Sequence, residues 1–293
     1  MKDVTIDYIF DKNVNKVKKL SKIYKINFTK NLEDIKKSSA AVIIATPTNT
    51  HHKYIKYFSD LKIFVEKPMV TNVKQALEVK KILKKNQLQC GFIERFNAVT
   101  PIIKKIIKSK KVISIDFKRT DKLSSRITDV DVILDLMIHD IDLAVFLNGK
   151  IKKISAYGFK EKNQISYASV ILFHKNRTIS HLESSKITQK KIRNINLTTT
   201  DSYVSADLLT KEVTINTQTT LDNKTITSQN HKNLIVNLKQ ERVIVNQKEA
   251  LKNELETFIN FCKNSNSKVP NIQESLYCLG IAEKIKNEIN KKL

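Results

Sequence analysis

The sequence predicts an α/β fold built from two unequal parts. Over the first hundred residues, short apolar runs alternate with amphipathic helical patterns, which is typical of a parallel sheet with crossover helices. From about residue 111 long β-rich stretches take over, and they favour a large, mainly antiparallel sheet. We therefore expect one domain over residues 1–97 and a second, α+β domain over residues 98–293.

The elements of the first domain are expected in a regular order along the chain. Apolar runs predict strands at residues 4–10, 40–46, 62–67 and 88–93. Apolar residues at helical spacing predict helices at residues 13–24, 51–61 and 73–86. This alternation of strands and helices is the pattern from which parallel sheets are built.

The second domain is expected to be rich in strands, with one strong helical pattern, DVILDLMIHDIDLAVFL, at residues 131–147. Its strands are predicted at residues 112–119, 151–159, 166–174, 177–185 and 193–201. The polar residues 219–230 indicate a loop or hairpin tip. Helical patterns at 248–264 and 273–293 end the chain.

The composition argues against a nucleic-acid partner. The formal net charge of +24 suits phosphate contacts, but only six of the 53 basic residues are arginines. Arginine is the residue that binds phosphate and guanine with two hydrogen bonds, so a lysine-rich charge of this kind is less specific. The lysines are also dispersed among apolar residues at helical spacing, which indicates solvated helix faces.

The sequence also lacks the marks of a secreted, membrane or metal-binding protein. No segment reaches the roughly 18 apolar residues of a membrane span, and the residues after Met1 lack the apolar run of a signal peptide. Cys90, Cys262 and Cys278 are odd in number and form no C-x-x-C pair. We expect buried free thiols, no metal site and a cytoplasmic protein.

Polar and charged residues follow two of the expected parallel strands. Glu66 and Lys67 come directly after the apolar run KIFV and precede Pro68, and Thr46 and Pro47 come after AAVIIA. In doubly wound sheets, ligands bind beyond the carboxyl ends of the strands. These residues are therefore expected to face a ligand crevice.

Several motifs resemble one enzyme family, in order and spacing over nearly the whole chain. They are ATPTNTHH at 45–52, VEKPMV at 65–70, GFIERFN at 91–97 and DLMIHDID at 135–142. They are similar to motifs of the glucose-fructose oxidoreductase and inositol dehydrogenase (Gfo/Idh/MocA) family. ERFN and DLMIHDIDL most resemble the branch that acts on nucleotide sugars, such as UDP-N-acetylglucosamine 3-dehydrogenases. The resemblance implies a Rossmann-type domain, NAD (or NADP) as cofactor and a sugar or nucleotide-sugar substrate.

Lys67 is the expected catalytic base. Oxidation of a secondary alcohol by a nicotinamide requires a base for the hydroxyl proton while the hydride leaves the carbon. A partly desolvated lysine beside the positively charged nicotinamide has its pKa lowered toward neutrality. The alternative is an ordinary surface lysine at a strand end. The resemblance also implies a cis peptide bond before Pro68.

Asp135 and His139 are the expected sugar-binding pair. They lie four residues apart on one apolar helix, so they share a face, and burying both without a function is costly. The resemblance implies that both contact the sugar hydroxyls, with His139 as acid/base or orienting group, and that they line one cleft with Lys67. The alternative is a capped or exposed pair. We expect Asp140 and Asp142 to be structural, in salt bridges.

The remaining candidates follow from the resemblance. The cofactor-binding set is Asp11, Thr46, Pro47, His51, Glu66 and Lys67, and the substrate-binding set is Arg95, Asn97, Arg126, Asp135 and His139. Asp11 matches the residue that accepts a hydrogen bond from the adenosine ribose; the alternative is a turn aspartate before Asn13. For His51, a wall of the cofactor crevice, the alternative is a helix start capped by Asn49 or Thr50.

The two arginines of the substrate set are candidates for a diphosphate. Arg95 lies in ERFN and Arg126 in SSRITD, and a guanidinium binds phosphate oxygens through forked hydrogen bonds. The alternative for each is a structural ion pair.

The chain departs from the family in its glycines. It has only four, and no G-x-G-x-x-G. A dinucleotide-binding domain opens with a strand, this glycine turn and a helix whose N-terminus meets the pyrophosphate. We therefore expect an N-terminally incomplete Rossmann-type domain that lacks about thirty residues. The expected function is an NAD(P)-dependent sugar dehydrogenase that forms a homo-oligomer through the open face of its large sheet. The alternative is a sugar-binding relic that has lost dinucleotide binding.

Overall fold

The computed structural model of the chain describes residues 4–122, 130–161, 163–220, 236–246, 248–264 and 266–293. Its contacts divide the chain into two compact units. The first comprises Met1–Phe92 and Lys252–Tyr277, and the second comprises Ile93–Leu251 and Cys278–Leu293. Lys252–Tyr277 thus packs with the first unit, although it lies in the range that the sequence analysis assigns to the second domain. None of the described helices is long and apolar enough to span a membrane.

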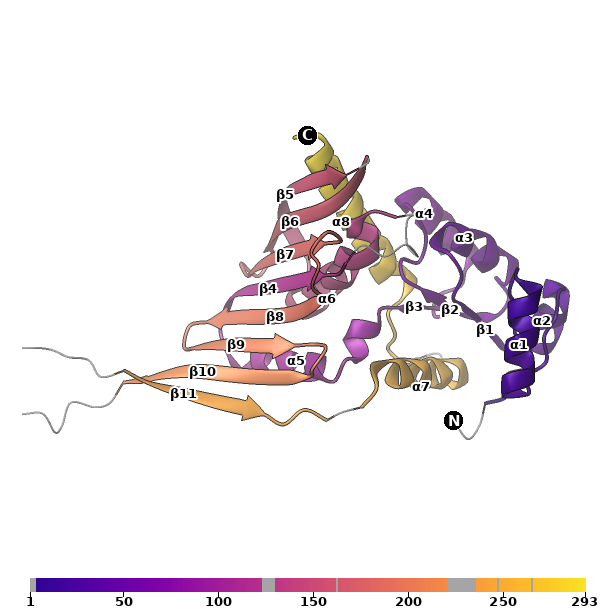
Figure 1. Cartoon of the computed structure of the whole chain (residues 1–293), viewed down its shortest axis with the longest axis horizontal. Coiled ribbons are helices and arrows are strands. Elements are labelled where there is room, and N and C mark those ends of the chain that lie inside the picture. Colours follow the sequence, from indigo (N-terminus) through magenta and orange to yellow (C-terminus); the bar gives the residue numbers. More distant parts are fainter. Residues whose placement is uncertain (1–3, 123–129, 162, 221–235, 247, 265) are drawn as a thin grey trace, which may run out of the picture. The chain divides into compact units, whose positions relative to one another are not determined.

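The first unit contains a three-stranded parallel sheet (Figure 1). Strands β1 (Ala41–Ile44), β2 (Lys62–Glu66) and β3 (Leu88–Gly91) pair in that order. The helices are α1 (Val14–Tyr24), α2 (Leu32–Ser38), α3 (Thr48–Tyr57), α4 (Val73–Ile82) and most of α7 (Ala250–Lys263). The central strand is buried at Ile63, Phe64 and Val65, as a parallel strand covered on both faces requires.

The strand that we expected at residues 4–10 is not formed. The described part of this segment makes only one parallel bridge, between Ile9 and Phe28. A strand is stabilised by the ladder of hydrogen bonds to a neighbour, and no described strand pairs with this segment. An apolar run alone is therefore insufficient here.

Aromatic packing explains why α7 belongs to the first unit. Phe64 of β2 packs against Phe258 of α7, with ring centroids 5.6 Å apart, and Phe261 joins the same core. The main chain supports this contact, because the amide of Cys90 donates to the carbonyl of Pro270 at 2.8 Å. Sequence periodicity predicts α7 as a helix, but its partner is set by these distant contacts.

The second unit is built on an eight-stranded sheet with the order β11-β10-β9-β8-β4-β7-β6-β5. The strands are β4 (Val112–Thr120), β5 (Ile151–Glu161), β6 (Gln164–His174), β7 (Ile179–Ser185), β8 (Ile192–Thr199), β9 (Ser202–Asp207), β10 (Glu212–Thr220) and β11 (Val236–Val243). Among the described strands of this sheet, β4 and β7 pair in parallel and the other neighbours pair antiparallel. The expected mainly antiparallel sheet is confirmed.

The two faces of this sheet differ. Helices α5 (Val99–Ser109), α6 (Ile138–Asn148) and the larger part of α8 (Ile272–Asn290) belong to the same unit, and α6 and α8 pack along one face (Figure 1). Side chains toward the helices, such as Val170 and Leu172, are fully buried. The alternate residues on β5 and β6 include large apolar side chains that stay exposed: Tyr157, Phe159, Ile171 and Phe173.

A 3₁₀ helix and a π-helical segment occur at two candidate motifs where the sequence predicts a strand end and an α-helix. The strand expected to run to residue 93 ends at Gly91, and a 3₁₀ helix, η1 (Ile93–Phe96), follows. The helix expected at 131–147 begins with a π-helical segment, η2 (Ile133–Met137), before α6. Asp131 caps this segment, since its Oδ1 accepts from the amides of Ile133 and Leu134.

Candidate active site

The carboxyl ends of β1 and β2 bring several candidate residues to one edge of the parallel sheet. Ile44 at the end of β1 pairs with Val65, one residue before the end of β2. The turns that leave these two strands carry Thr46 and Lys67, respectively. The Lys67–Pro68 peptide bond is cis, which confirms that expectation. The edge is therefore of the kind where doubly wound sheets bind ligands.

His51 joins these two turns. It lies on α3 with only 1% of its surface exposed. Its Nε2 is 2.7 Å from the carbonyl oxygen of Thr46, and its Nδ1 is 3.0 Å from the carbonyl oxygen of Pro68. One side chain thus holds the turn after β1 against the turn after β2.

The start of α3 differs from the capped start considered in the sequence analysis. The N-cap is Pro47, and none of the described side chains caps the helix. Thr50 instead donates its hydroxyl to the carbonyl of Pro47 at 2.8 Å and lies 2.7 Å from the hydroxyl of Thr46. Thr46 and Pro47 therefore form a compact turn directly beyond β1.

Glu66 is the acidic residue of this edge. The amide of Lys67 donates to its Oε2 at 3.3 Å, and a Cβ at Gly91 would lie 3.0 Å from the same oxygen, so the glycine leaves room for the carboxylate. Burial raises the pKa of Glu66 above its ordinary value, although the hydrogen bond and charge of Lys67 and the charge of His51 oppose this. Carboxyl groups shifted in this way are typical of functional sites.

The second unit holds the other catalytic candidates, Asp135 and His139. Asp135 lies in η2 and His139 in the first turn of α6, and π-helical segments occur frequently at functional sites. Asp135 is 7% exposed, and His139 is half-buried. The carboxylate of Asp135 pairs with Nζ of Lys186 at 3.0 Å, and Lys186 also donates to the carbonyl of Val130 at 2.8 Å.

Sequence analysis missed Lys186 as a neighbour of the candidate site. It follows β7, and the signal in the sequence is only a lysine after a strand end. The parallel pairing of β7 with β4, and the contacts of β7 with η2, bring it to Asp135. Such a contact between segments fifty residues apart has no local signature.

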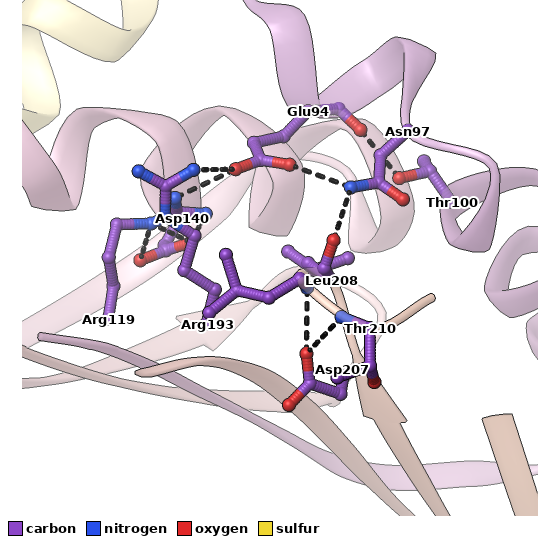
Figure 2. Close-up of polar contacts among 10 residues, drawn as sticks. Glu94, Asn97, Thr100, Arg119, Asp140, Arg193, Asp207, Leu208 and Thr210 are labelled. Carbon is purple, nitrogen blue, oxygen red and sulfur yellow. Dashed lines mark hydrogen bonds and ion pairs between the residues drawn. The ribbon is translucent and has the colours of Figure 1, made fainter. Parts of the chain in front are cut away.

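A buried charge network anchors η1 (Figure 2). Arg119 of β4 is 2% exposed and donates to both oxygens of Asp140 at 2.8–3.0 Å and to Glu94 at 2.8 Å. Burial by itself raises the pKa of Glu94, but the charge and hydrogen bonds of Arg119 outweigh it and hold the pKa below its ordinary value. Asn97 donates to Glu94 at 3.2 Å and to the carbonyl of Leu208 at 3.1 Å. The ERFN stretch is thereby fixed in the second unit.

Arg95 of the same stretch is also held by a carboxylate. Its Nε and Nη2 donate to the two oxygens of Asp142 at 2.8 and 2.6 Å, and its guanidinium lies 4.7 Å from the ring centre of Phe146. Both side chains of the pair are buried. This geometry favours the structural ion pair over the diphosphate ligand, and it confirms that Asp140 and Asp142 form salt bridges.

The two remaining candidates are placed as follows. Asp11 accepts from the amide of Asn13 at 2.8 Å and pairs with Lys16 at 3.2 Å, and the hydrogen bond from Asn13 lowers its pKa. This is the arrangement of a turn aspartate before α1, and its contact with a ribose stays a prediction. Arg126 lies outside the described residues.

Two family models match this chain. Residues 1–93 match the model described as the oxidoreductase family, NAD-binding Rossmann fold (GFO_IDH_MocA), and residues 115–203 match the GFO/IDH/MocA C-terminal domain. The chain belongs to the Gfo/Idh/MocA family. The expected membership of an oxidoreductase family with an NAD-binding Rossmann domain is thereby confirmed.

Two relatives of known function share part of the sequence. UDP-N-acetylglucosamine 3-dehydrogenase of Acidithiobacillus ferrooxidans is 23% identical over 210 residues, which cover 69% of this chain and 66% of the relative. Inositol 2-dehydrogenase of Rhizobium meliloti is 30% identical over 121 residues, 38% of this chain and 37% of the relative. The matches thus span about two thirds and little more than one third of these relatives.

Solved structures of the family share the fold over nearly the whole chain. UDP-N-acetylglucosamine 3-dehydrogenase GnnA from Acidithiobacillus ferrooxidans superimposes with a TM-score of 0.84 at 20% identity, over 97% of this chain and 90% of that chain. Levoglucosan dehydrogenase in complex with NADH gives a TM-score of 0.82 at 13% identity, over 98% and 88%. These likenesses confirm the expected two-part α/β architecture.

The described residues of this Gfo/Idh/MocA chain fit one part of a dinucleotide site. The turn beyond β1 carries Thr46, the last residue of β2 is Glu66, and Lys67 follows it at the edge where doubly wound sheets bind ligands. Gly91 leaves space for the Glu66 carboxylate. The sequence contains no G-x-G-x-x-G, so Thr46, Glu66 and Lys67 are the candidates for contact with the cofactor, and no glycine turn is among them.

Proposed function

We propose that this chain transfers a hydride between NAD(P) and a secondary alcohol of a sugar or nucleotide sugar. The observation that carries the proposal is the Glu66-Lys67-Pro68 turn at the carboxyl end of β2. This turn lies inside the segment that matches the NAD-binding domain, and His51 fixes it against the turn after β1. When bound, the nicotinamide supplies the hydride acceptor or donor.

In this proposal each unit contributes defined roles. Lys67 takes the proton of the substrate hydroxyl as the alcohol is oxidised and returns it in the reverse direction. Asp135 and His139 bind the sugar hydroxyls, and His139 also orients or relays the proton. Lys186 neutralises the Asp135 carboxylate and holds it at 3.0 Å, so that this acceptor keeps one orientation.

The first substrate to test is UDP-N-acetylglucosamine, with oxidation at the 3-position. Support comes from the relative of that name and from the ERFN and DLMIHDID stretches. Thermal unfolding is measured with UDP-N-acetylglucosamine, UDP alone, inositol and glucose, because a ligand that binds only the folded chain raises its stability. We expect the UDP-sugar to raise the unfolding temperature more than UDP does, and inositol and glucose to leave it unchanged. Stabilisation by inositol or glucose instead contradicts this substrate class.

The second candidate, a sugar-binding relic, rests on the lack of a G-x-G-x-x-G in the sequence. A titration with NADH followed by fluorescence discriminates the two. Saturable NADH binding together with NADH formation from NAD and the UDP-sugar supports the dehydrogenase. Sugar binding without any NADH binding supports the relic.

We also propose that the chain forms a homo-oligomer in the cytoplasm. The support for self-association is the set of apolar side chains exposed on β5 and β6, on the sheet face opposite the helices: Tyr157, Phe159, Ile171 and Phe173. Large apolar side chains exposed on one sheet face mark a candidate protein–protein interface.

A further inference from the structure

Among the described residues, the two ring nitrogens of His51 meet two hydrogen-bond acceptors, both of them backbone carbonyl oxygens. Its two ring nitrogens lie 2.7 and 3.0 Å from the backbone carbonyl oxygens of Thr46 and Pro68. A carbonyl oxygen accepts hydrogen bonds and has no proton to give. A neutral imidazole carries one N–H, so it satisfies one of these carbonyls and turns a lone pair toward the other. Only the doubly protonated ring donates to both.

His174 of β6 shows the contrasting arrangement in the same chain. Its Nδ1 lies 3.0 Å from the carbonyl oxygen of Gly149, but its Nε2 lies 2.9 Å from the hydroxyl of Ser180. A hydroxyl can donate, so the neutral ring satisfies both contacts. Burial lowers the pKa of His174, which favours this neutral form. Both histidines are at least 98% buried, and they differ in what their second nitrogen meets.

A buried cation needs a counter-charge, and Glu66 is the candidate for it at this sheet edge. Glu66 is the acidic residue of the same sheet edge. Burial raises its pKa, and the hydrogen bond and charge of Lys67 and the charge of His51 act in the opposite direction. Lys67 is the other charged group of that turn. His52, the next residue of α3, pairs with Glu78 of α4 at 3.0 Å.

We infer that His51 is an imidazolium that positions the cofactor-side turns of the sheet edge: its two N–H groups hold the carbonyls of Thr46 and Pro68 together and set Lys67 at the end of β2. The role in cofactor binding rests on the proposed function, whereas the protonation state does not. His51 acts through the two turns and is a positioning residue.

The direct test is NMR of the full chain labelled with ¹⁵N-histidine, without ligand, at about pH 7. We expect both nitrogens of His51 to give protonated ring signals, while His174 gives one protonated and one unprotonated nitrogen. The signals are assigned with His51→Gln and His174→Asn. A neutral His51, with one unprotonated nitrogen, overturns the inference, and this result does not depend on NAD binding.

The second test is NADH affinity. His51→Gln offers one amide nitrogen in place of two separated N–H groups, and losing a charged hydrogen bond predicts a roughly tenfold or greater rise in the Kd for NADH. The matched control is His52→Gln on the same helix, for which the Kd is expected within about twofold of the parent. An unchanged Kd in His51→Gln overturns the positioning role. If the parent chain itself binds no NADH, the proposed function fails and the NMR result alone decides the charge of His51.

Discussion

The ammonium of Lys186 lies 3.0 Å from the carboxylate of Asp135 and donates a second hydrogen bond, of 2.8 Å, to the carbonyl of Val130. The pair joins the end of β7 to the π-helical segment η2. Both side chains are largely buried. The Asp135 carboxylate, which we propose as a sugar ligand, is therefore held in place by Lys186.

Replacing Lys186 by methionine should therefore weaken both the fold and substrate binding. Asp135 loses this counter-charge in a buried place, which we expect to cost about 1–3 kcal/mol in the free energy of unfolding. The KM for the sugar should rise while the Kd for NADH stays unchanged. Urea unfolding and steady-state kinetics measure these effects, with Lys190→Met, an exposed lysine nearby, as the control. A variant that behaves like this control argues against a role for the pair.

Arg119 should be among the most sensitive positions of the second unit. It holds both Asp140 and Glu94, so Arg119→Met removes the shared partner of two buried carboxylates. Removing one side of such a buried ion pair costs about 3–5 kcal/mol, which chemical denaturation can measure. Arg177→Met, at an exposed turn, should change the stability by less than about 0.5 kcal/mol. Equal stabilities of the two variants contradict the structural role of the network.

His174 should make the chain less stable in mild acid. Burial lowers its pKa in the folded chain, so its contribution to stability is present above the unfolded pKa of about 6.5 and is lost as the pH falls through the folded pKa. The loss of unfolding free energy between about pH 7.5 and pH 5 should shrink in His174→Asn. It should persist in His181→Asn, whose ring is 41% exposed. An unchanged pH dependence in His174→Asn contradicts this assignment.

The exposed apolar face should control self-association. Phe159→Ser combined with Phe173→Ser removes two exposed rings from β5 and β6, and we expect the mass measured by light scattering to fall toward that of one chain. Leu77→Ser, an exposed apolar residue on α4, is the control and should leave the mass unchanged. A parent chain that is already monomeric at micromolar concentration contradicts the proposed oligomer.

Sequence periodicity predicts most of the elements of this fold, because their apolar patterns are local. The buried run at residues 62–66 and the alternating pattern at 166–174 become β2 and β6 as expected. The segment at residues 4–10 fails because a strand depends on a neighbour that pattern alone does not supply. The π-helical start of the helix expected at 131–147 likewise leaves no mark in the spacing of its apolar residues.

The site is less predictable than the fold, because its contacts join distant segments. The apolar run KIFV places Glu66 and Lys67 at a strand end, and in the structure Glu66 is the last residue of β2 and Lys67 follows it, whereas their roles stay predictions. The contacts of His51 with the carbonyls of Thr46 and Pro68 join separate turns, and the pair of Lys186 with Asp135 joins segments fifty residues apart. Folding brings these groups together, and no local pattern predicts them. The sequence leaves two roles open for Arg95, and its two hydrogen bonds to Asp142 favour the structural ion pair.

The account depends most on Lys67 as the base. The most direct measurement is kcat and KM for UDP-N-acetylglucosamine with NAD in the parent chain, in Lys67→Ala and in the control Lys74→Ala, an exposed lysine on α4. Loss of a positioned base predicts a fall in kcat of about 10²–10⁴-fold for Lys67→Ala, with KM and NADH affinity nearly unchanged, and parent-like values for Lys74→Ala. A Lys67→Ala enzyme that keeps the parent kcat would contradict the proposed mechanism.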